Sequence, residues 1–307
     1  MAHRLLHVSV DEQQARPFLK WAGGKRQLLA EIESYYPFSC RRIKKYAEPF
    51  VGGGAVLFDI LNKYDLEAVY ISDINVELIN AYRAVRGAVE ELVPWLARLE
   101  GEFLPLDREG RKAYYLAQRQ RFNKIAITVG GKVNVEKAAL LIFLNRTCFN
   151  GLFRVNRRGD FNVPMGVYKN PLICDEGNLR MVSKKLREVT IVCADYRSAA
   201  DFIDANTFVY FDPPYRPLTS TANFTSYTAG SFDDAAQIEL AAFVDAMHNK
   251  GAKVVVSNSD PKNTNCKDEF FDRIYAARNI HRVAANRMIN CNREARGKIQ
   301  ELLISNF

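Results

Sequence analysis

A strand-like run at residues 207–211 leads into four residues that can act on a planar amino group. They are Asp212, Pro213, Pro214 and Tyr215. The exocyclic amine of a base is a weak nucleophile because its lone pair is delocalised into the ring. The Asp212 carboxylate can accept one amino hydrogen and the Pro213 carbonyl the other, which favours a tetrahedral nitrogen. The Tyr215 ring can stack on the base, and the prolines stiffen the loop. The alternative, a proline-rich turn that ends a buried strand, is disfavoured by the strand context.

Three consecutive glycines, residues 52–54, follow a second strand-like run and precede an amphipathic helical pattern. Glycine allows a tight turn and the close approach of a ligand, so cofactors favour this place in α/β folds. Asp73 ends the next strand-like run, where its carboxylate can accept both hydroxyls of a ribose. The dinucleotide fingerprint is absent, and no Gly-Lys-Ser/Thr follows. A nucleoside without a pyrophosphate therefore fits better than a dinucleotide, and a plain strand-to-helix turn is the alternative.

A further glycine-containing loop, within residues 18–29, places Trp21, Gly24 and Lys25 at the opening of a helix. A lysine at this end opposes the helix dipole, so a simple capping role is disfavoured. An anion such as a carboxylate of the cofactor would compensate for the position of Lys25. The alternative is an exposed lysine on a turn.

The net charge of +8 and the pI near 9.1 suggest a polyanionic partner, provided that the charge gathers in one place. It does gather within residues 141–170, where five basic residues face the single acid Asp160. The basic residues are Arg146, Arg154, Arg157, Arg158 and Lys169. Two extended arms flank the turn at residues 157–160, which predicts a β-hairpin that could enter a groove of DNA. A solvated basic turn is the alternative.

Short apolar runs rich in Val, Ile, Tyr and Phe alternate with amphipathic helical patterns, which predicts an α/β sheet covered by helices on both faces. The expected strands are residues 43–50, 69–73, 189–193, 207–211, 253–257 and 301–306. The alternation of strand and helix patterns lapses between about residues 76 and 188. We therefore predict a catalytic domain at 1–75 plus 189–307 and a mostly helical insert at 76–188. The histidines and cysteines are not spaced to ligate an ion, and no metal is predicted.

With these motifs, the chain closely resembles the Dam-like DNA adenine-N6 methyltransferases, in which cofactor motif, target-recognition insert and catalytic motif come in that order. The matching blocks are FLKWAGGKRQLL, AEPFVGGGAVLFDI, NRTCFNGLFRVNRRGDFNVPMG, VYFDPPY, the SNS near residue 258 and RGKIQELLISNF. The blocks span nearly the whole chain. The resemblance implies a Rossmann-like methyltransferase sheet of seven strands with an antiparallel last hairpin, and S-adenosyl-L-methionine as the cofactor.

The resemblance also implies roles for individual residues. The predicted cofactor-binding residues are Trp21, Gly24, Lys25, Phe50, Gly52, Gly54, Asp73, Asp195, Tyr196 and Asp212. Among them, Asp195 matches the position that contacts the adenine of the cofactor. The predicted DNA-binding residues are Lys20, Arg146, Phe149, Asn150, Leu152, Arg154, Arg157, Arg158 and Pro164.

Chemistry on a base inside a duplex requires that the base be flipped out of the stack. The resemblance implies that Phe149 matches the family's wedge beside the vacated space and that Lys20 matches the family's contact to the first guanine of a GATC site. Relatives commonly have Arg where this chain has Val167, so a base or phosphate contact is missing. The favoured target is nevertheless GATC.

The leading hypothesis is an enzyme that methylates the N6 amine of adenine in double-stranded DNA by direct transfer. The alternatives are an RNA adenine methyltransferase, disfavoured by the basic insert, and a non-catalytic DNA-binding protein, disfavoured by the intact Lys25, Asp73 and catalytic loop. We expect a bacterial or viral protein in the cytoplasm, associated with the nucleoid and not with a membrane. It should act as a monomer or weak dimer, and a cognate restriction endonuclease is a candidate genetic companion.

Overall fold

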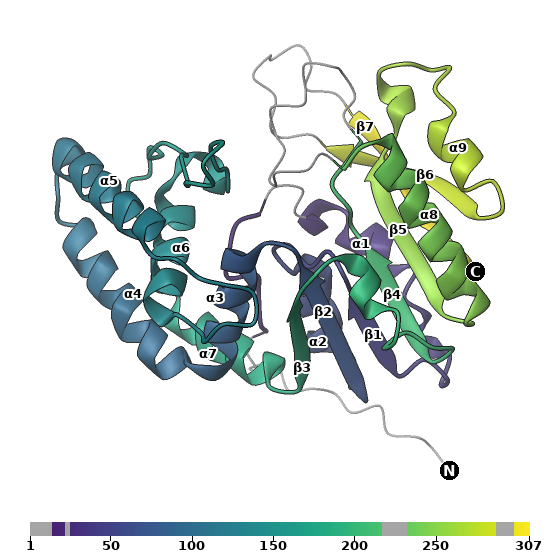
Figure 1. The fold of residues 1–307 in the computed structure, drawn as a ribbon, viewed down its shortest axis with the longest axis horizontal. Coiled ribbons are helices and arrows are strands. Elements are labelled where there is room, and N and C mark those ends of the chain that lie inside the picture. Colours follow the sequence, from purple (N-terminus) through teal and green to yellow (C-terminus); the bar gives the residue numbers. More distant parts are fainter. Residues whose placement is uncertain (1–13, 22–24, 217–231, 287–297) are drawn as a thin grey trace.

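The computed structural model describes residues 14–21, 25–216, 232–286 and 298–307. In these segments, seven strands form one sheet in the order β3-β2-β1-β4-β5-β7-β6 (Figure 1). The strands are β1 Lys45–Glu48, β2 Ala68–Asp73, β3 Val189–Cys193, β4 Thr207–Phe211, β5 Lys253–Ser259, β6 Asn279–Asn286 and β7 Lys298–Ser305. Strands β1 to β5 pair in parallel, whereas β7 is antiparallel to both β5 and β6. The predicted sheet and its antiparallel last hairpin are confirmed.

The strand β6 carries no clear strand signal in the sequence. It pairs with β7 alone and forms an edge of the sheet. Its residues His281 and Arg282 are exposed, so it lacks the continuous apolar run of the central strands. The neighbouring strand β7 supplies the pairing that holds it in place.

Helices cover both faces of the sheet, as the alternation of strand and helix patterns predicts. They are α1 Leu29–Glu33, α2 Ala55–Lys63, α3 Val76–Gly87, α4 Val89–Phe103, α5 Arg108–Lys124, α6 Val135–Thr147, α7 Glu176–Leu186, α8 Asp234–Asn249 and α9 Phe270–Ile274. Alternate residues of β4 face opposite sides, because successive side chains of a strand point in opposite directions. Phe208 and Tyr210 join the core that contains α2 and α3, whereas Val209 and Phe211 pack with residues of α8.

The helices α4, α5 and α6 form a group beyond the β3 end of the sheet (Figure 1). The helix α6 lies in its centre, with every residue from Lys137 to Asn145 buried. The helix α3 packs on β2 and β3 and also on α6, and so connects the helical group to the sheet. No helix in the described segments is long and apolar enough to span a membrane.

The predicted hairpin after α6 forms isolated antiparallel bridges, Cys148 with Met165 and Val155 with Phe161, instead of two ladder strands. The backbone of its second arm binds side chains of α5. The Val163 carbonyl accepts hydrogen bonds from Tyr115 and Arg119. Backbone groups of this arm therefore bind side chains of α5, and fewer of them are available for a β-ladder with the first arm.

Candidate active site

The predicted catalytic loop begins directly after β4, at the edge of the sheet where the parallel strands end. Strands β1, β2 and β4 are neighbours, so the residues that follow them meet there. The Asp212 carboxylate accepts a hydrogen bond from Ser257 Oγ at 2.9 Å through Oδ1. The hydroxyl of Tyr210 donates in turn to Ser257 at 3.0 Å. The carboxylate is thereby oriented from the adjacent strand β5.

Lys25 lies against this loop and not out in solvent. Its side chain is 4% exposed, and its Nζ is 2.8 Å from Asp212 Oδ1. The same ammonium donates to the hydroxyl of Tyr215 and lies 4.4 Å from the centroid of its ring. The anion that the sequence calls for beside Lys25 is thus supplied, within the protein, by Asp212. The predicted contact of Lys25 with the cofactor stays a prediction.

Glu301, on β7, is a site residue that the sequence did not reveal. Its Oε2 accepts a hydrogen bond from the Tyr215 hydroxyl at 2.5 Å and lies 3.8 Å from Lys25 Nζ. Burial, together with the carboxylates of Asp212 and Glu301, raises the pKa of the Tyr215 phenol well above its ordinary value. The phenol therefore stays protonated and acts as a donor. Glu301 falls within a block that matches relatives, but nothing local marks it as functional.

The backbone of the loop is held by α8 and β5. Gln237 is fully buried, and its Nε2 donates to the Pro214 carbonyl at 3.1 Å. Its Oε1 accepts from Asn258 Nδ2 at 3.2 Å. Arg216, the next residue after the loop, binds both carboxylate oxygens of Asp234 at 2.6 and 2.9 Å. These contacts with residues of α8 and β5 thus fix the position of the loop.

Two acceptors of this loop remain available. Within the described segments, no hydrogen bond reaches Asp212 Oδ2 or the Pro213 carbonyl, because the neighbouring side chains bind Asp212 Oδ1 and the Pro214 carbonyl instead. These are the two groups that the sequence assigns to the hydrogens of an amine. The geometry therefore supplies two free acceptors beside an aromatic ring.

The predicted cofactor residues around the glycines lie at the ends of β1 and β2. The backbone N–H of Gly52 donates to Asp73 Oδ2 at 3.2 Å, and that of Asn75 donates to Oδ1 at 2.9 Å. Burial raises the pKa of the Asp73 carboxyl, and these backbone donors oppose the shift. A carboxylate oxygen carries two lone pairs, so both Asp73 oxygens can accept a hydroxyl in addition to their backbone donors.

The glycines are required by close packing. Gly54 has φ +71°, and a Cβ at this position would lie 2.5 Å from the hydroxyl of Tyr82. A Cβ on Gly52, with φ +47°, would lie 2.9 Å from the indole of Trp21. The absence of a Cβ therefore allows the backbone of the loop to approach the Trp21 ring, and a ligand bound beside that ring, closely.

The other predicted cofactor residues occupy the same edge. Trp21 stacks on Phe153 of the insert, with ring centroids 5.6 Å apart. Phe50 and Tyr196 stack at 5.5 Å. Asp195 is exposed and accepts the backbone N–H of Arg197 at 2.9 Å. Gly24 lies outside the described residues.

Most of the predicted DNA-binding residues lie on the segment after α6, whereas Arg146 lies within α6 and Lys20 directly precedes Trp21. Asn145 joins that segment to Lys20, because its side chain binds the backbone N–H and carbonyl of Lys20, each at 2.7 Å, and the Gly151 carbonyl at 2.9 Å. The Lys20 ammonium lies 4.3 Å from the ring centroid of Tyr168. Phe149 is 52% exposed, and its role as a wedge stays a prediction.

The remaining DNA-binding candidates differ in their surroundings. Asn150, Arg157, Arg158 and Pro164 are exposed, and Leu152 is half-buried. The exposed Arg154 donates through Nε to Asn162 Oδ1 at 2.7 Å. Arg146 is half-buried and directs its guanidinium inward to the Phe18 carbonyl at 2.9 Å. The structure thus brings most candidates to the surface and uses Arg146 to hold the N-terminal segment.

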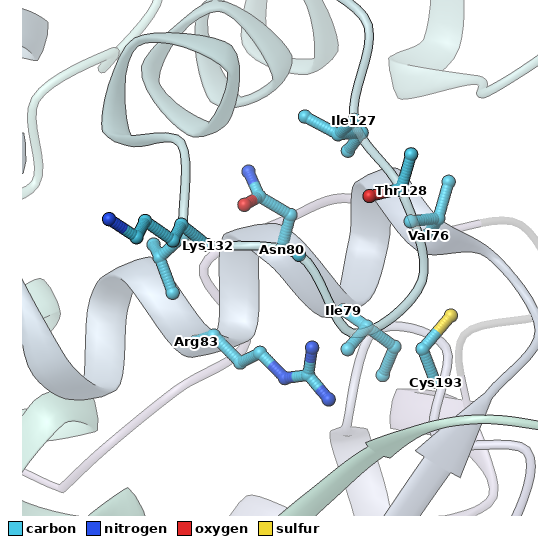
Figure 2. A pocket seen from close by; sticks show the side chains of 10 residues that line it. Val76, Ile79, Asn80, Arg83, Ile127, Thr128, Lys132 and Cys193 are labelled. Atoms are coloured by element: carbon cyan, nitrogen blue, oxygen red, sulfur yellow. The ribbon is translucent and has the colours of Figure 1, made fainter.

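A small pocket lies between α3 and the loop at residues 127–133 (Figure 2). Its lining includes Asn80 and Arg83 from α3 and Cys193 at the end of β3. None of the residues that line it is predicted to bind the cofactor or DNA. It is separate from the set of residues described above.

A seven-stranded sheet with an antiparallel β7 is the fold of the S-adenosylmethionine-dependent methyltransferases. The family model of the D12 class N6 adenine-specific DNA methyltransferases matches residues 21–289. The chain belongs to this family and is an N6-adenine DNA methyltransferase.

Similar proteins carry consistent names. The type II methyltransferase M.MjaIII of Methanocaldococcus jannaschii is 49% identical over 297 residues, which cover 96% of this chain and 100% of that protein. The type II methyltransferase M1.LlaDCHI of Lactococcus lactis subsp. cremoris is 36% identical, with 95% of both chains covered. The DNA adenine methylase of Escherichia coli K12 is 35% identical, with 94% of both chains covered.

Proposed function

We propose that this enzyme methylates the N6 amine of adenine in duplex DNA, with GATC as the favoured target, after flipping the adenine out of the helix. The observation that carries the chemistry is the pair of free acceptors, Asp212 Oδ2 and the Pro213 carbonyl, on one rigid loop. Accepting both amino hydrogens localises the lone pair on nitrogen, which can then attack a methyl group directly. The Tyr215 ring supplies the surface on which the flipped base stacks.

We infer that S-adenosyl-L-methionine is the cofactor, which supplies the methyl group from a sulfonium. The residues present fit it, because Asp73 has lone pairs for two ribose hydroxyls and the tight turn at Gly54 leaves room for close approach. We assign Phe50, Tyr196 and Asp195 to the cofactor site, with Asp195 as the contact to its adenine.

We infer that residues 76–188 form the target-recognition domain and residues 1–75 with 189–307 the catalytic domain. Phe149 is the candidate wedge and Arg154 the candidate base reader. Val167 is 91% exposed on the same segment, so the missing arginine removes a contact that an apolar side chain cannot replace. The names of two relatives as type II methyltransferases favour a restriction endonuclease as genetic companion. We further propose action as a monomer or weak dimer on chromosomal DNA in the cytoplasm.

The decisive experiment incubates the protein with labelled S-adenosylmethionine and duplexes that contain or lack GATC, and then sequences the modified bases in DNA from expressing cells. We expect N6-methyladenine within GATC. Methylation at another sequence would reject the target, methylation of structured RNA in competition with duplex DNA would reject the substrate, and no methylation would reject the activity.

The role of Asp212 is tested by Asp212→Ala with the exposed Asp201→Ala as matched control. The single-turnover rate should fall about a hundredfold or more at saturating cofactor and DNA, because an acceptor is lost where positive charge develops on nitrogen. Specific DNA binding should persist. A rate near that of the wild type would remove Asp212 from the chemistry.

A further inference from the structure

Glu301 is 14% exposed and comes from the last strand, far from the catalytic loop in sequence. It reaches the loop because β7 lies antiparallel beside β5, in a register that places Glu301 opposite Ser259. Its partners are Tyr215, at 2.5 Å, and Lys25, at 3.8 Å. A carboxylate buried this deeply must be paired, and both partners belong to the site.

These groups form a continuous chain. Lys25 donates to the Tyr215 hydroxyl, and that hydroxyl donates to Glu301. Lys25 also pairs with Asp212 at 2.8 Å, so one ammonium lies between two carboxylates. The Tyr215 ring is therefore held at its far end by a charge-assisted hydrogen bond, in addition to the backbone contacts that hold the loop.

We propose that Glu301 is a positioning residue, which fixes the Tyr215 ring in the orientation that stacks the target adenine. This inference rests on the proposed function of the site. The ring is joined to the backbone by two torsions alone, and a bond to its hydroxyl restrains both. A base stacked on a loose ring would present its amine to the methyl group at variable distance, and a displacement of about 1 Å can cost about a hundredfold in rate.

Glu301 also gives a role to the block RGKIQELLISNF, which contains none of the catalytic motifs. The strand delivers one carboxylate to the loop, while its other side chains Leu302, Leu303 and Ile304 are buried in the core. The antiparallel strand thus contributes to the geometry of the site as well as to the sheet.

The test is a double-mutant cycle of Glu301→Ala and Tyr215→Phe, read as single-turnover rate at saturating cofactor and DNA. Glu301→Ala should slow methyl transfer about 10- to 100-fold, as expected for loss of a hydrogen bond to a charged group. Glu301→Gln keeps an acceptor oxygen and should restore most of the rate. In the Tyr215→Phe background, Glu301→Ala should have little further effect, because the hydroxyl through which it acts is gone.

A spectroscopic readout separates positioning from stability. With 2-aminopurine at the target position, the flipped base should fluoresce more strongly in Glu301→Ala than in the wild type, because a loose ring stacks on it less well. Glu188→Ala, an exposed site away from the loop, should match the wild type in both assays. If Glu301→Ala does not fold, the 2-aminopurine fluorescence of Glu301→Gln is compared with that of Tyr215→Phe. Glu301→Gln keeps the hydrogen bond and should match the wild type, whereas Tyr215→Phe loses it and should fluoresce more strongly.

The outcomes are distinct. Additive effects of the two substitutions, or a wild-type rate in Glu301→Ala, would overturn the positioning role while wild-type methylation stands. Absence of methylation by the wild-type protein would instead reject the proposed function, and the positioning role with it.

Discussion

At the scale of single residues, the site combines groups that the sequence marks with groups that it hides. Asp73 and Asp212 stand at the ends of strands, where a carboxylate is conspicuous. Lys25 is conspicuous too, but its partners are not. The role of each charged residue depends on the groups around it. The predictions at this scale therefore concern substitutions of single carboxylates.

Asp73→Ala should weaken binding of S-adenosylhomocysteine by about 1.5 to 3 kcal/mol, because it removes the acceptor for two ribose hydroxyls. Asp73→Asn keeps one acceptor oxygen and should lose less. Since Asp73 also accepts the Gly52 and Asn75 N–H groups, thermal unfolding of each variant is measured beside the calorimetric titration. Unchanged affinity in a folded Asp73→Ala protein would contradict the ribose assignment.

Glu48 predicts a pH dependence of stability. Burial raises the pKa of its carboxyl well above the ordinary value, Asp212 adds to the shift, and the hydroxyl of Tyr46, which donates to it at 2.7 Å, opposes it. The native state then binds more protons than the unfolded state between the ordinary and the raised pKa. The contribution of Glu48 to stability is therefore full below the ordinary pKa and falls as the pH rises toward the raised one.

Glu48→Gln removes this titration. The difference in free energy of unfolding between Glu48→Gln and the wild type should move in favour of the variant as the pH rises from 4 to 8. Urea unfolding at several pH values measures it. A difference that does not change with pH would show that the pKa of Glu48 is the same in the native and unfolded states.

At the scale of elements, each catalytic group depends on a neighbour that is remote in sequence. The loop after β4 is held by α8 through Gln237, by β5 through Ser257 and by β7 through Glu301. The segment after α6 is held by α5 and by Asn145 of α6. The helices therefore set the positions of both the loop after β4 and the segment after α6.

Gln237→Met should lower the single-turnover rate about tenfold to a hundredfold, because the Pro214 carbonyl loses its donor and the neighbouring Pro213 acceptor is no longer fixed. It should also cost about 1 to 3 kcal/mol of stability, since Asn258 and Pro214 lose a buried partner. Ile238→Met, at an exposed position of the same helix, is the control. Loss of stability with an unchanged rate would limit Gln237 to a structural role.

At the scale of the whole molecule, contacts between residues remote in sequence join the basic segment after α6 to the segment that ends at Trp21. The stack of Trp21 on Phe153 and the bonds of Asn145 to Lys20 connect the two parts. Reading a sequence and gripping a phosphate differ in one measurable respect, because contact to a base edge discriminates between sequences and contact to phosphate does not.

Arg154→Ala should cost about 1 to 3 kcal/mol on the cognate duplex and far less on a scrambled one. Its bond to Asn162 holds the guanidinium in one orientation, as a base reader requires. Arg157→Ala or Arg158→Ala should weaken both duplexes alike and reduce the salt slope by about one phosphate contact each. Binding titrations at several salt concentrations measure these effects. Equal losses on both duplexes for Arg154→Ala would transfer recognition to Lys20, Leu152 and Pro164.

Much of the fold could be predicted from the sequence alone. The strands β1 to β5 and β7 contain short apolar runs whose residues are largely buried, and the amphipathic stripes of α2, α3 and α8 can be recognised without knowledge of their neighbours. The antiparallel hairpin followed from resemblance and not from periodicity. The edge strand β6 was missed because an exposed edge carries little apolar signal.

The residues of the candidate site likewise fall into those that the sequence predicts and those that only the structure reveals. The residues Asp73 and Asp212 could be predicted because the end of a strand is a local feature. Tertiary structure alone decided that Lys25 pairs with Asp212, that Glu301 binds Tyr215, and that Arg146 turns inward. Each of these contacts joins segments far apart in the chain, and the order of strands in the sheet determines which segments meet. A chain encodes its strands locally, but it brings their ends together only when the long-range pairing of the whole sheet repays the entropy of closing the loops between them.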